Sequence, residues 1–175
     1  MARPNTPEID LFERGVLVRL SGVDAGYGAA TVLVGLDFES RAGEVALVTG
    51  PAAAGKTTFM HLLWLALQPR SGRAVILGQD VVRARARARA GVKRRIGYVA
   101  ENPVFIEQWT AFDNIAMPLR MLGKKPREYA DDVRELVDFV GLNDAADLTI
   151  EKLSGAERHR AAIARALAAK PDLIL

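Results

Sequence analysis

The segment that most constrains the fold of this chain is Gly50–Thr57, which begins with glycine and ends in Gly-Lys-Thr. It matches the pattern G-x-x-x-x-G-K-[ST], in which successive backbone N–H groups surround phosphate oxygens. An apolar run, Val45–Thr49, precedes it, and an apolar-periodic stretch, Thr58–Leu65, follows it. This order predicts a strand, a phosphate-binding loop, and a helix whose N-terminus faces an anion. We therefore expect the chain to bind a nucleoside triphosphate.

Individual residues of this phosphate loop have predicted roles. Gly50 and Gly55 allow backbone conformations that a Cβ would disfavour, so that N–H groups can converge on one anion. Lys56 is expected to reach the outer phosphates, and the hydroxyl of Thr57 is placed to ligate Mg²⁺. The alternative is an ordinary glycine turn between a strand and a helix, which the match over eight positions disfavours.

The composition sets outer limits on function. With 175 residues, of which 50% are hydrophobic and 26% charged, the chain has room for one soluble domain with an inserted subdomain. A net charge of +3 is too small to argue for nucleic-acid binding, and without cysteine there is neither a disulfide nor a thiolate metal site. No apolar stretch approaches the roughly 18 residues of a membrane helix, and the N-terminus lacks a signal-peptide core. A cytoplasmic location is expected.

Hydrophobic periodicity and turn residues predict an alternation of strands and helices. Residues 1–14 are polar and contain proline, which is typical of a flexible arm. Strands are expected at 16–20, 31–39, 73–77 and 96–99, with a loop from Ser21 to Ala30. Helices are expected at 111–122 with an interruption at Pro118, at 126–140, and from Ser154 to Ala169, before an apolar strand begins at Leu173.

Residues 83–90 are four Arg-Ala repeats, followed closely by Lys93, Arg94 and Arg95. One interpretation is a solvated helical face, because arginine and alanine are both strong helix formers. The other is a basic patch for lipid head groups or nucleic acid. The even spacing scatters the arginines around a helix, and no aromatic residue lies between them, so the solvated face is favoured.

The segment Leu153–Glu157, read as Leu-Ser-Gly-Ala-Glu, precedes an alanine- and arginine-rich helix. Ser154 is a good N-cap, and Glu157 three residues later completes a capping box. The N–H groups of such a helix start form an anion site. Alone, the pattern predicts only where a helix begins.

In context, this segment and the following Ala164–Leu167 resemble the ATP-binding cassette (ABC) ATPases, whose signature is L-S-G-G-[EQ] before a helix ending in A-R-A-L. The order of motifs is also similar: an early aromatic (Tyr27), the phosphate loop, a glutamine-loop position after I-G-x-V, a helical insert, the signature and an apolar strand. The resemblance covers roughly residues 15–175.

The resemblance implies the fold. We expect an α/β, P-loop NTPase (RecA-like) core with an antiparallel β subdomain and a helical subdomain at about residues 102–153. In this family the strand beginning at Leu173 leads to an Asp that orders Mg²⁺ and then to the catalytic Glu. Both would lie after Leu175, so the cassette is expected to be incomplete at its C-terminus and, as supplied, inactive in hydrolysis.

The resemblance also implies the site. Tyr27 would stack on adenine, the alternative being a tyrosine packed on the surface. In the same subunit the triphosphate and Mg²⁺ would be held by Gly50, Pro51, Ala52, Ala53, Ala54, Gly55, Lys56, Thr57 and Thr58. In a head-to-tail homodimer, the partner's nucleotide would be contacted by Ser154, Gly155, Ala156 and Glu157. Glu101 stands where the family has its glutamine, and would join Thr57 as a Mg²⁺ ligand.

Four of these positions depart from the family pattern. Ala52 and Ala53 replace Ser and Gly in the phosphate loop, Ala156 replaces the second signature glycine, and Glu101 brings a carboxylate toward the phosphates. Together they raise a second hypothesis, a non-hydrolytic or degenerate ATP-dependent interaction module.

Within the superfamily the sequence is most similar to the cell-division ATPase FtsE, ahead of its relatives in lipoprotein and macrolide export. The segments Arg94–Val99 and Thr110–Arg120 carry this likeness. It implies an ATPase that couples ATP binding and hydrolysis to an integral membrane partner, FtsX, at the inner face of the plasma membrane. The alternatives are an export-type ABC ATPase and, drawing on the arginine repeats, a DNA-associated one, although no nucleic-acid partner is expected.

Overall fold

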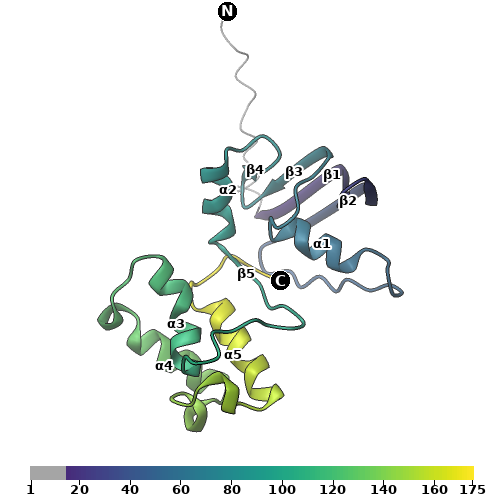
Figure 1. Ribbon diagram of the computed structural model, residues 1–175. Coiled ribbons are helices and arrows are strands. Elements are labelled where there is room, and N and C mark those ends of the chain that lie inside the picture. Colours follow the sequence, from purple (N-terminus) through teal and green to yellow (C-terminus); the bar gives the residue numbers. More distant parts are fainter. Residues whose placement is uncertain (1–14) are drawn as a thin grey trace, which may run out of the picture. The chain divides into compact units, whose positions relative to one another are not determined.

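The computed structural model describes residues 15–175, which form two compact units divided between Lys93 and Arg94 (Figure 1). The predicted arm at residues 1–14 lies outside the described residues. The first unit contains an antiparallel sheet and two helices, and the second contains three α-helices and a short parallel strand pair. The predicted α/β class, with an antiparallel β subdomain, is confirmed.

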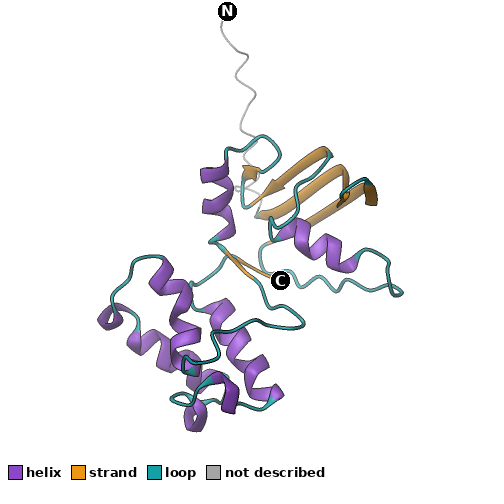
Figure 2. Cartoon of the chain, viewed as in Figure 1, coloured by secondary structure: helices purple, strands orange, loops and turns teal. Residues whose placement is uncertain are grey.

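The sheet of the first unit has the strand order β2-β1-β3-β4 (Figure 2). Its strands are β1 (Val16–Tyr27), β2 (Ala30–Arg41), β3 (Ser71–Ile76) and β4 (Gln79–Asp80). Along the start of β1 the buried residues alternate: Val16, Val18 and Leu20 are inside, and the residues between them, Leu17 and Arg19, are partly exposed. This period of two is typical of a sheet with one face in the core.

Strand β1 is longer than the sequence predicted, because Ser21–Tyr27 continues it instead of forming a loop. Register shifts against β2 accommodate the small residues in this stretch, and Gly22 has a φ of 57°. The hairpin closes with Tyr27 opposite Ala30 and Gly28 at a φ of 53°. Pairing with both β2 and β3 supplies the hydrogen bonds that a loop would lack.

Asp24 joins the three long strands. Its carboxylate accepts hydrogen bonds from the Gly35 N–H on β2 at 2.7 Å and from the Ser71 hydroxyl on β3 at 2.7 Å. The bond from Gly35 contributes most to holding the pKa of Asp24 below its usual value, and the bond from Ser71 adds to it. The carboxylate thus fixes the sheet where β1 turns toward the hairpin.

The strand predicted before the phosphate loop is not formed. Residues 44–50 pair with no strand in the described part of the chain, and the side chains of Val45 and Leu47 are 99% and 86% exposed. An apolar β-branched run specifies a strand only when a neighbouring strand accepts its backbone hydrogen bonds, and within residues 15–175 none does. The sequence prediction was wrong here because pairing is a tertiary property.

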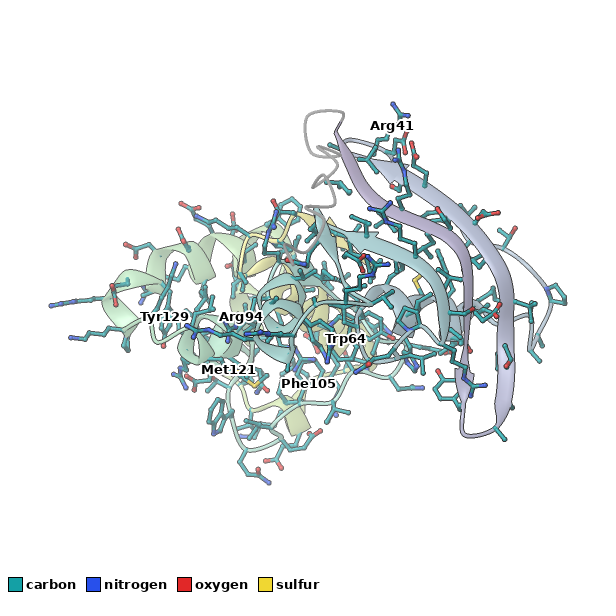
Figure 3. All side chains as sticks on the ribbon, turned by 90° about the horizontal axis from the view of Figure 1, so that it is seen from above. Arg41, Trp64, Arg94, Phe105, Met121 and Tyr129 are labelled. Atoms are coloured by element: carbon teal, nitrogen blue, oxygen red, sulfur yellow. The ribbon has the colours of Figure 1, made fainter. Side chains whose placement is uncertain are left out.

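The helices of the first unit are α1 (Lys56–Leu63) and α2 (Ala86–Lys93). Phe59 of α1 packs edge to face on Phe38 of β2, with ring centroids 5.0 Å apart. Only the last arginines of the repeat, Arg87 and Arg89, lie within α2, while Arg83 and Arg85 precede it and are exposed. The ammonium of Lys93 lies 4.0 Å from the ring centroid of Trp64 (Figure 3).

The second unit is built on α3 (Ala111–Met121), α4 (Ala130–Phe139) and α5 (Gly155–Leu167), joined by three 3₁₀ turns (Figure 1). These turns are η2 (Pro126–Glu128), η3 (Asn143–Ala145) and η4 (Ile150–Lys152). One core unites the helices, and its largest fully buried members include Ile115, Leu119, Tyr129, Val133, Leu142 and Ile150. The predicted helical subdomain at 102–153 lies inside this unit.

Two details of these helices differ from the predictions. Helix α3 is not interrupted at Pro118, because a proline removes one N–H bond while Ile115 and Leu119 on either side are buried in the core. The segment 126–140 is divided into η2 and α4 by Tyr129, whose ring is buried. The predicted stop at Gly141 is confirmed by its φ of 68°.

The strands predicted at 96–99 and from Leu173 form a parallel pair, β5 (Ile96–Gly97) and β6 (Leu173–Ile174). The pairing extends past the strand ends, since the Val99 N–H donates to the Leu175 carbonyl at 2.9 Å. Among the described helices, none is both long and apolar enough to cross a membrane.

Candidate functional site

The phosphate loop is closed on itself by Lys56. The Lys56 ammonium donates hydrogen bonds to the carbonyl of Gly50 at 2.8 Å and to that of Pro51 at 2.7 Å. The Ala54 N–H also donates to the Pro51 carbonyl, at 3.3 Å. These bonds curl residues 50–56 into a ring with the lysine across it. The same ammonium can exchange a neutral carbonyl oxygen for an oxygen of an anionic phosphate, with which its hydrogen bond is stronger.

Gly55 is the hinge between this loop and α1. It caps the helix in the left-handed conformation, with φ 88° and ψ 8°. It is also buried against β2, because a Cβ at this position would lie 2.9 Å from Leu33 Cδ2 and 3.3 Å from Val32 Cγ1. Conformation and space both require glycine, so the sheet fixes where the helix begins.

Ala53 occupies a conformation that suits glycine better. Its φ is 61°, in the left-handed region that costs a residue with a Cβ about 1–2 kcal/mol. In the phosphate loop, this is the position at which alanine replaces the glycine of the family pattern. The loop therefore keeps its shape at the cost of local backbone strain.

The N-terminus of α1 is suited to bind an anion. Its first turn holds no acidic residue, and its N-cap makes no side-chain hydrogen bond. The first N–H groups therefore have no capping side chain, and the partial positive charge of the helix dipole at this end is not offset by a carboxylate. Thr57 is exposed there, whereas Thr58 is buried. The exposed hydroxyl fits a Mg²⁺ ligand. Thr58 fits a role in anchoring α1.

Tyr27 lies at the end of the β1–β2 hairpin with its side chain about half exposed. Its hydroxyl shares a 2.8 Å hydrogen bond with Nδ1 of His61 on α1. The two rings meet edge to face, with centroids 6.4 Å apart and an interplanar angle of 89°. This contact spans 34 residues of sequence and leaves no local signal, so sequence reasoning does not find it.

Arg70, which the sequence analysis did not single out, holds the backbone of the same hairpin. Its guanidinium donates to the Gly28 carbonyl at 2.6 Å and to the Thr31 hydroxyl at 2.9 Å. Its N–H donates to the Asp24 carbonyl at 2.8 Å. Because Arg70 precedes β3, the strand after α1 also fixes the turn that presents Tyr27.

The second set of predicted site residues begins α5. The Ser154 N–H and hydroxyl donate to Glu157 Oε2 at 2.8 and 2.7 Å, and the Glu157 N–H donates to Ser154 Oγ at 3.3 Å. The predicted capping box is thereby confirmed. The hydrogen bonds from the Ser154 side chain and then its backbone hold the pKa of Glu157 below its usual value. Ser154, Gly155 and Ala156 are exposed, so this helix start can be reached by a ligand.

Glu101 is exposed in the segment between β5 and α3. Two arginines of α5 hold the residues that follow it. Arg158 pairs with the Glu107 carboxylate at 3.1 Å, and Arg165 donates to the Val104 carbonyl at 2.7 Å. The Arg165 guanidinium also lies 4.4 Å from the ring centroid of Phe105, which is labelled in Figure 3. Burial of this guanidinium lowers the pKa of Arg165. The signature helix thus positions the segment that carries Glu101.

The predicted site residues therefore fall into two groups. Tyr27 and Gly50–Thr58 belong to the first unit, and Glu101 and Ser154–Glu157 belong to the second. Within residues 15–175 no three acidic or histidine side chains converge to form a metal site. The donor chemistry still fits Mg²⁺, which is held by one or two protein oxygens together with substrate phosphates in nucleotide sites.

This chain belongs to the ABC transporter family, because residues 33–175 match the family over both the phosphate loop and the signature helix. It is an ABC ATP-binding domain. Members of the family hydrolyse ATP.

Individual relatives agree with this assignment. The methionine import ATP-binding protein MetN of Chromohalobacter salexigens is 34% identical over 163 residues, which cover 91% of this chain and 47% of that protein. The lipoprotein-releasing system ATP-binding protein LolD of Bacteroides thetaiotaomicron is 32% identical over 160 residues, covering 91% and 73%. The chain thus spans about half the length of this MetN and about three quarters of this LolD.

A solved structure has the same fold. It is a dimeric ATP-binding cassette in a post-hydrolysis state, bound to ADP and Pi, with a TM-score of 0.82 and 25% identity. The match covers 90% of this chain and 72% of that one.

Proposed function

We propose that this chain is the ATP-binding subunit of an ABC-type complex that couples ATP binding and hydrolysis to a membrane partner. The observation that best supports this proposal is the geometry of the phosphate loop. Lys56 lies across a ring of backbone at the N-terminus of α1, where the first turn has no acidic residue. This geometry favours a polyphosphate over other anions, because ammonium, helix dipole and loop N–H groups converge.

The proposed site includes both groups of residues. Gly50–Thr58 bind the triphosphate, with Thr57 and Glu101 at Mg²⁺, and Tyr27 stacks on the base. Ser154–Glu157 of a second copy close over the outer phosphate, so the active form is a head-to-tail homodimer with two composite sites. The exposed signature turn supports this part of the proposal, as does the dimeric state of the similar solved cassette.

Titration calorimetry with Mg·ATP tests the binding step. Lys56→Ala is expected to weaken binding at least tenfold, because it removes the only lysine of the loop and its charge-assisted hydrogen bonds. Lys170→Ala removes an equal charge from an exposed ion pair with Asp132 and serves as the control. Equal affinities for the wild type and Lys56→Ala would contradict the proposal.

The homodimer is tested by light scattering during gel filtration. ATP or a non-hydrolysable analogue is expected to shift the chain toward a dimer, and Ser154→Glu to prevent the shift by placing a negative charge against the partner's phosphates. A monomer at saturating nucleotide would contradict the composite site.

For the membrane partner, we propose an FtsX-like permease and a role in cell division at the inner face of the plasma membrane. The segments Arg94–Val99 and Thr110–Arg120, which are similar to FtsE, support this role. Deleting the gene is expected to delay division and produce filaments. Normal division with impaired lipoprotein release would instead favour the export-type alternative, to which the likeness to LolD points.

A degenerate, non-hydrolytic interaction module is the second candidate, and the strained Ala53 and the carboxylate of Glu101 favour it. In the whole product of the gene, Glu101→Gln and Ala53→Gly would restore hydrolysis if these departures had abolished it. A wild type that already hydrolyses ATP would exclude this candidate.

A further inference from the structure

The contact between Tyr27 and His61 links two elements of the first unit, the end of β1 and the helix α1, which the proposed function assigns to the base and the phosphates of a nucleotide. Tyr27 terminates β1, and His61 lies on α1, five residues after Lys56. The Tyr27 hydroxyl shares a 2.8 Å hydrogen bond with His61 Nδ1. The two rings meet edge to face, and the Tyr27 side chain is about half exposed, so part of its surface is open to a ligand.

Helix geometry fixes the distance along α1 between His61 and the phosphate loop. With a rise of 1.5 Å per residue, His61 lies about 7.5 Å along α1 from Lys56. The helix is rigid over this distance, and its Phe59 and Leu62 are buried. A hydrogen bond from His61 therefore sets the spacing between the tyrosine ring and the phosphate loop.

Backbone and ring are restrained separately. Arg70 fixes the hairpin turn through hydrogen bonds to the Gly28 carbonyl and the Thr31 hydroxyl. The bond to His61, by contrast, is made by the Tyr27 side chain itself and so restrains the orientation of the ring.

We propose that His61 is a positioning residue for the nucleobase, holding Tyr27 so that a base bound through its phosphates finds the ring already oriented. This inference rests on the proposed function, in which Tyr27 stacks on the base. Binding then avoids the entropy of ordering the tyrosine, a cost that would otherwise weaken affinity by roughly three- to tenfold. The ligand feature recognised is an aromatic base, with preference given by stacking and not by base identity.

The test compares ATP with inorganic tripolyphosphate, which offers phosphates and no base. Calorimetry on the full 175-residue chain is carried out for the wild type, His61→Ala, Tyr27→Phe and the double variant. We expect His61→Ala to weaken ATP three- to tenfold and leave tripolyphosphate unchanged. Tyr27→Phe keeps the ring but removes the hydroxyl, so it should have a similar effect, and the double variant should be no weaker than either single one.

Two further variants separate positioning from folding. His61→Gln retains a side chain that can hydrogen-bond the tyrosine hydroxyl, and it should recover part of the ATP affinity. His159→Ala changes the other histidine of the chain, on α5, and should bind both ligands as the wild type does.

Unchanged or tighter ATP binding by His61→Ala would overturn the inference, as would an equal loss for tripolyphosphate. Additive losses in the double variant would overturn it too. The proposed function fails in a different way: the wild type would bind neither ligand, or Tyr27→Ala would bind ATP normally. Either of those results removes the stacking role and the inference with it.

Discussion

Ala53 and Gly55, two residues apart in the phosphate loop, both have positive φ, but only one is glycine. Gly55 meets the requirement at no steric cost, and the close approach of β2 adds a second reason for it. Ala53 adopts the same positive φ at a steric cost, because in this conformation its Cβ lies close to the following carbonyl oxygen. The hydrogen bonds of Lys56 thus hold the loop in a shape that the backbone preference of Ala53 disfavours.

The first prediction concerns this strain. Ala53→Gly should stabilise the folded chain by about 0.5–1 kcal/mol. The substitution removes the strain of an alanine in the left-handed conformation, and this gain exceeds the cost of the greater conformational entropy that glycine has in the unfolded chain. Thermal unfolding should shift upward by about 2–4 °C for a change of 1 kcal/mol. Ala54→Gly, at a neighbour whose φ is not positive, should lower the midpoint. A lower midpoint for both would contradict the assignment.

Asn114 supports the second unit from within. It is fully buried on α3, accepts a hydrogen bond from the Ile106 N–H at 2.9 Å, and donates to the carbonyls of Ile106 and Thr110 at 3.0 Å each. The side chain therefore fastens the segment between Glu101 and α3 to the helical core.

The second prediction is that Asn114→Ala destabilises the protein by about 1–3 kcal/mol, because it strips the Ile106 N–H of its partner. Denaturant unfolding monitored by circular dichroism measures the loss. Asn143→Ala removes an exposed amide that donates to Asp138, and should change stability by no more than about 0.5 kcal/mol. Equal small effects would show that the buried amide is dispensable.

Among the elements, α5 depends on its first turn. The Ser154–Glu157 capping box satisfies N–H groups that the helix cannot, and it places a carboxylate at the positive end of the dipole. The pKa of Glu157 is lowered, so its contribution is fully present above the unfolded value of about 4.5 and is lost as the pH falls through the lower folded value.

The third prediction follows from that direction. Hydrogen-exchange protection at the start of α5 should fall as the pH drops below about 4.5, because the protonated carboxyl no longer accepts its bonds. Glu157→Gln keeps a capping side chain without a titrating group and should flatten this dependence. Glu135→Gln removes the same charge from α4 and should not. An unaltered pH profile in Glu157→Gln would refute the assignment.

The fourth prediction compares the effects of replacing two glycines by alanine. At Gly97 in β5, a Cβ would lie 2.6 Å from the Ala166 carbonyl oxygen and 3.1 Å from Pro171 Cγ, so Gly97→Ala should cost about 1–3 kcal/mol. At Gly91 in α2, a Cβ would meet nothing within 4 Å, and Gly91→Ala should gain about 0.5–1 kcal/mol of helix stability. Thermal unfolding of both variants measures these changes, and shifts of the same sign would contradict the packing at β5.

At the scale of the whole molecule, the second unit has a hydrophobic core built from one continuous stretch of the chain. All members of the helical core lie between Val99 and Ala168, and the β5–β6 pair closes the same segment. A core drawn entirely from one stretch of chain is the usual mark of a segment able to fold independently.

The fifth prediction is that residues 94–175, expressed alone, unfold cooperatively on heating and give a helical circular dichroism spectrum. Ile115→Ala in this segment should cost about 2–5 kcal/mol because it empties a fully buried position. Met121→Ala, at a side chain that is 80% exposed, should cost little. A spectrum without helix would show that the segment needs residues outside 94–175.

Features of this protein set by neighbours along the chain could be predicted from its sequence. The phosphate loop, the capping box at Ser154 and the stop at Gly141 depend on residues within about six positions of each other, and such contacts form wherever the local pattern occurs. The family could also be identified, because the order of these motifs is part of the sequence.

Tertiary structure alone decided what depends on distant partners. The extension of β1 to Tyr27 required β2 and β3, and the apolar run at 45–49 failed to become a strand because no described strand pairs with it. Helix α3 continued through Pro118 because its flanking residues are buried. The bond between Tyr27 and His61 spans 34 positions, a separation at which side-chain proximity is set by sheet register and helix docking and leaves no trace in local sequence.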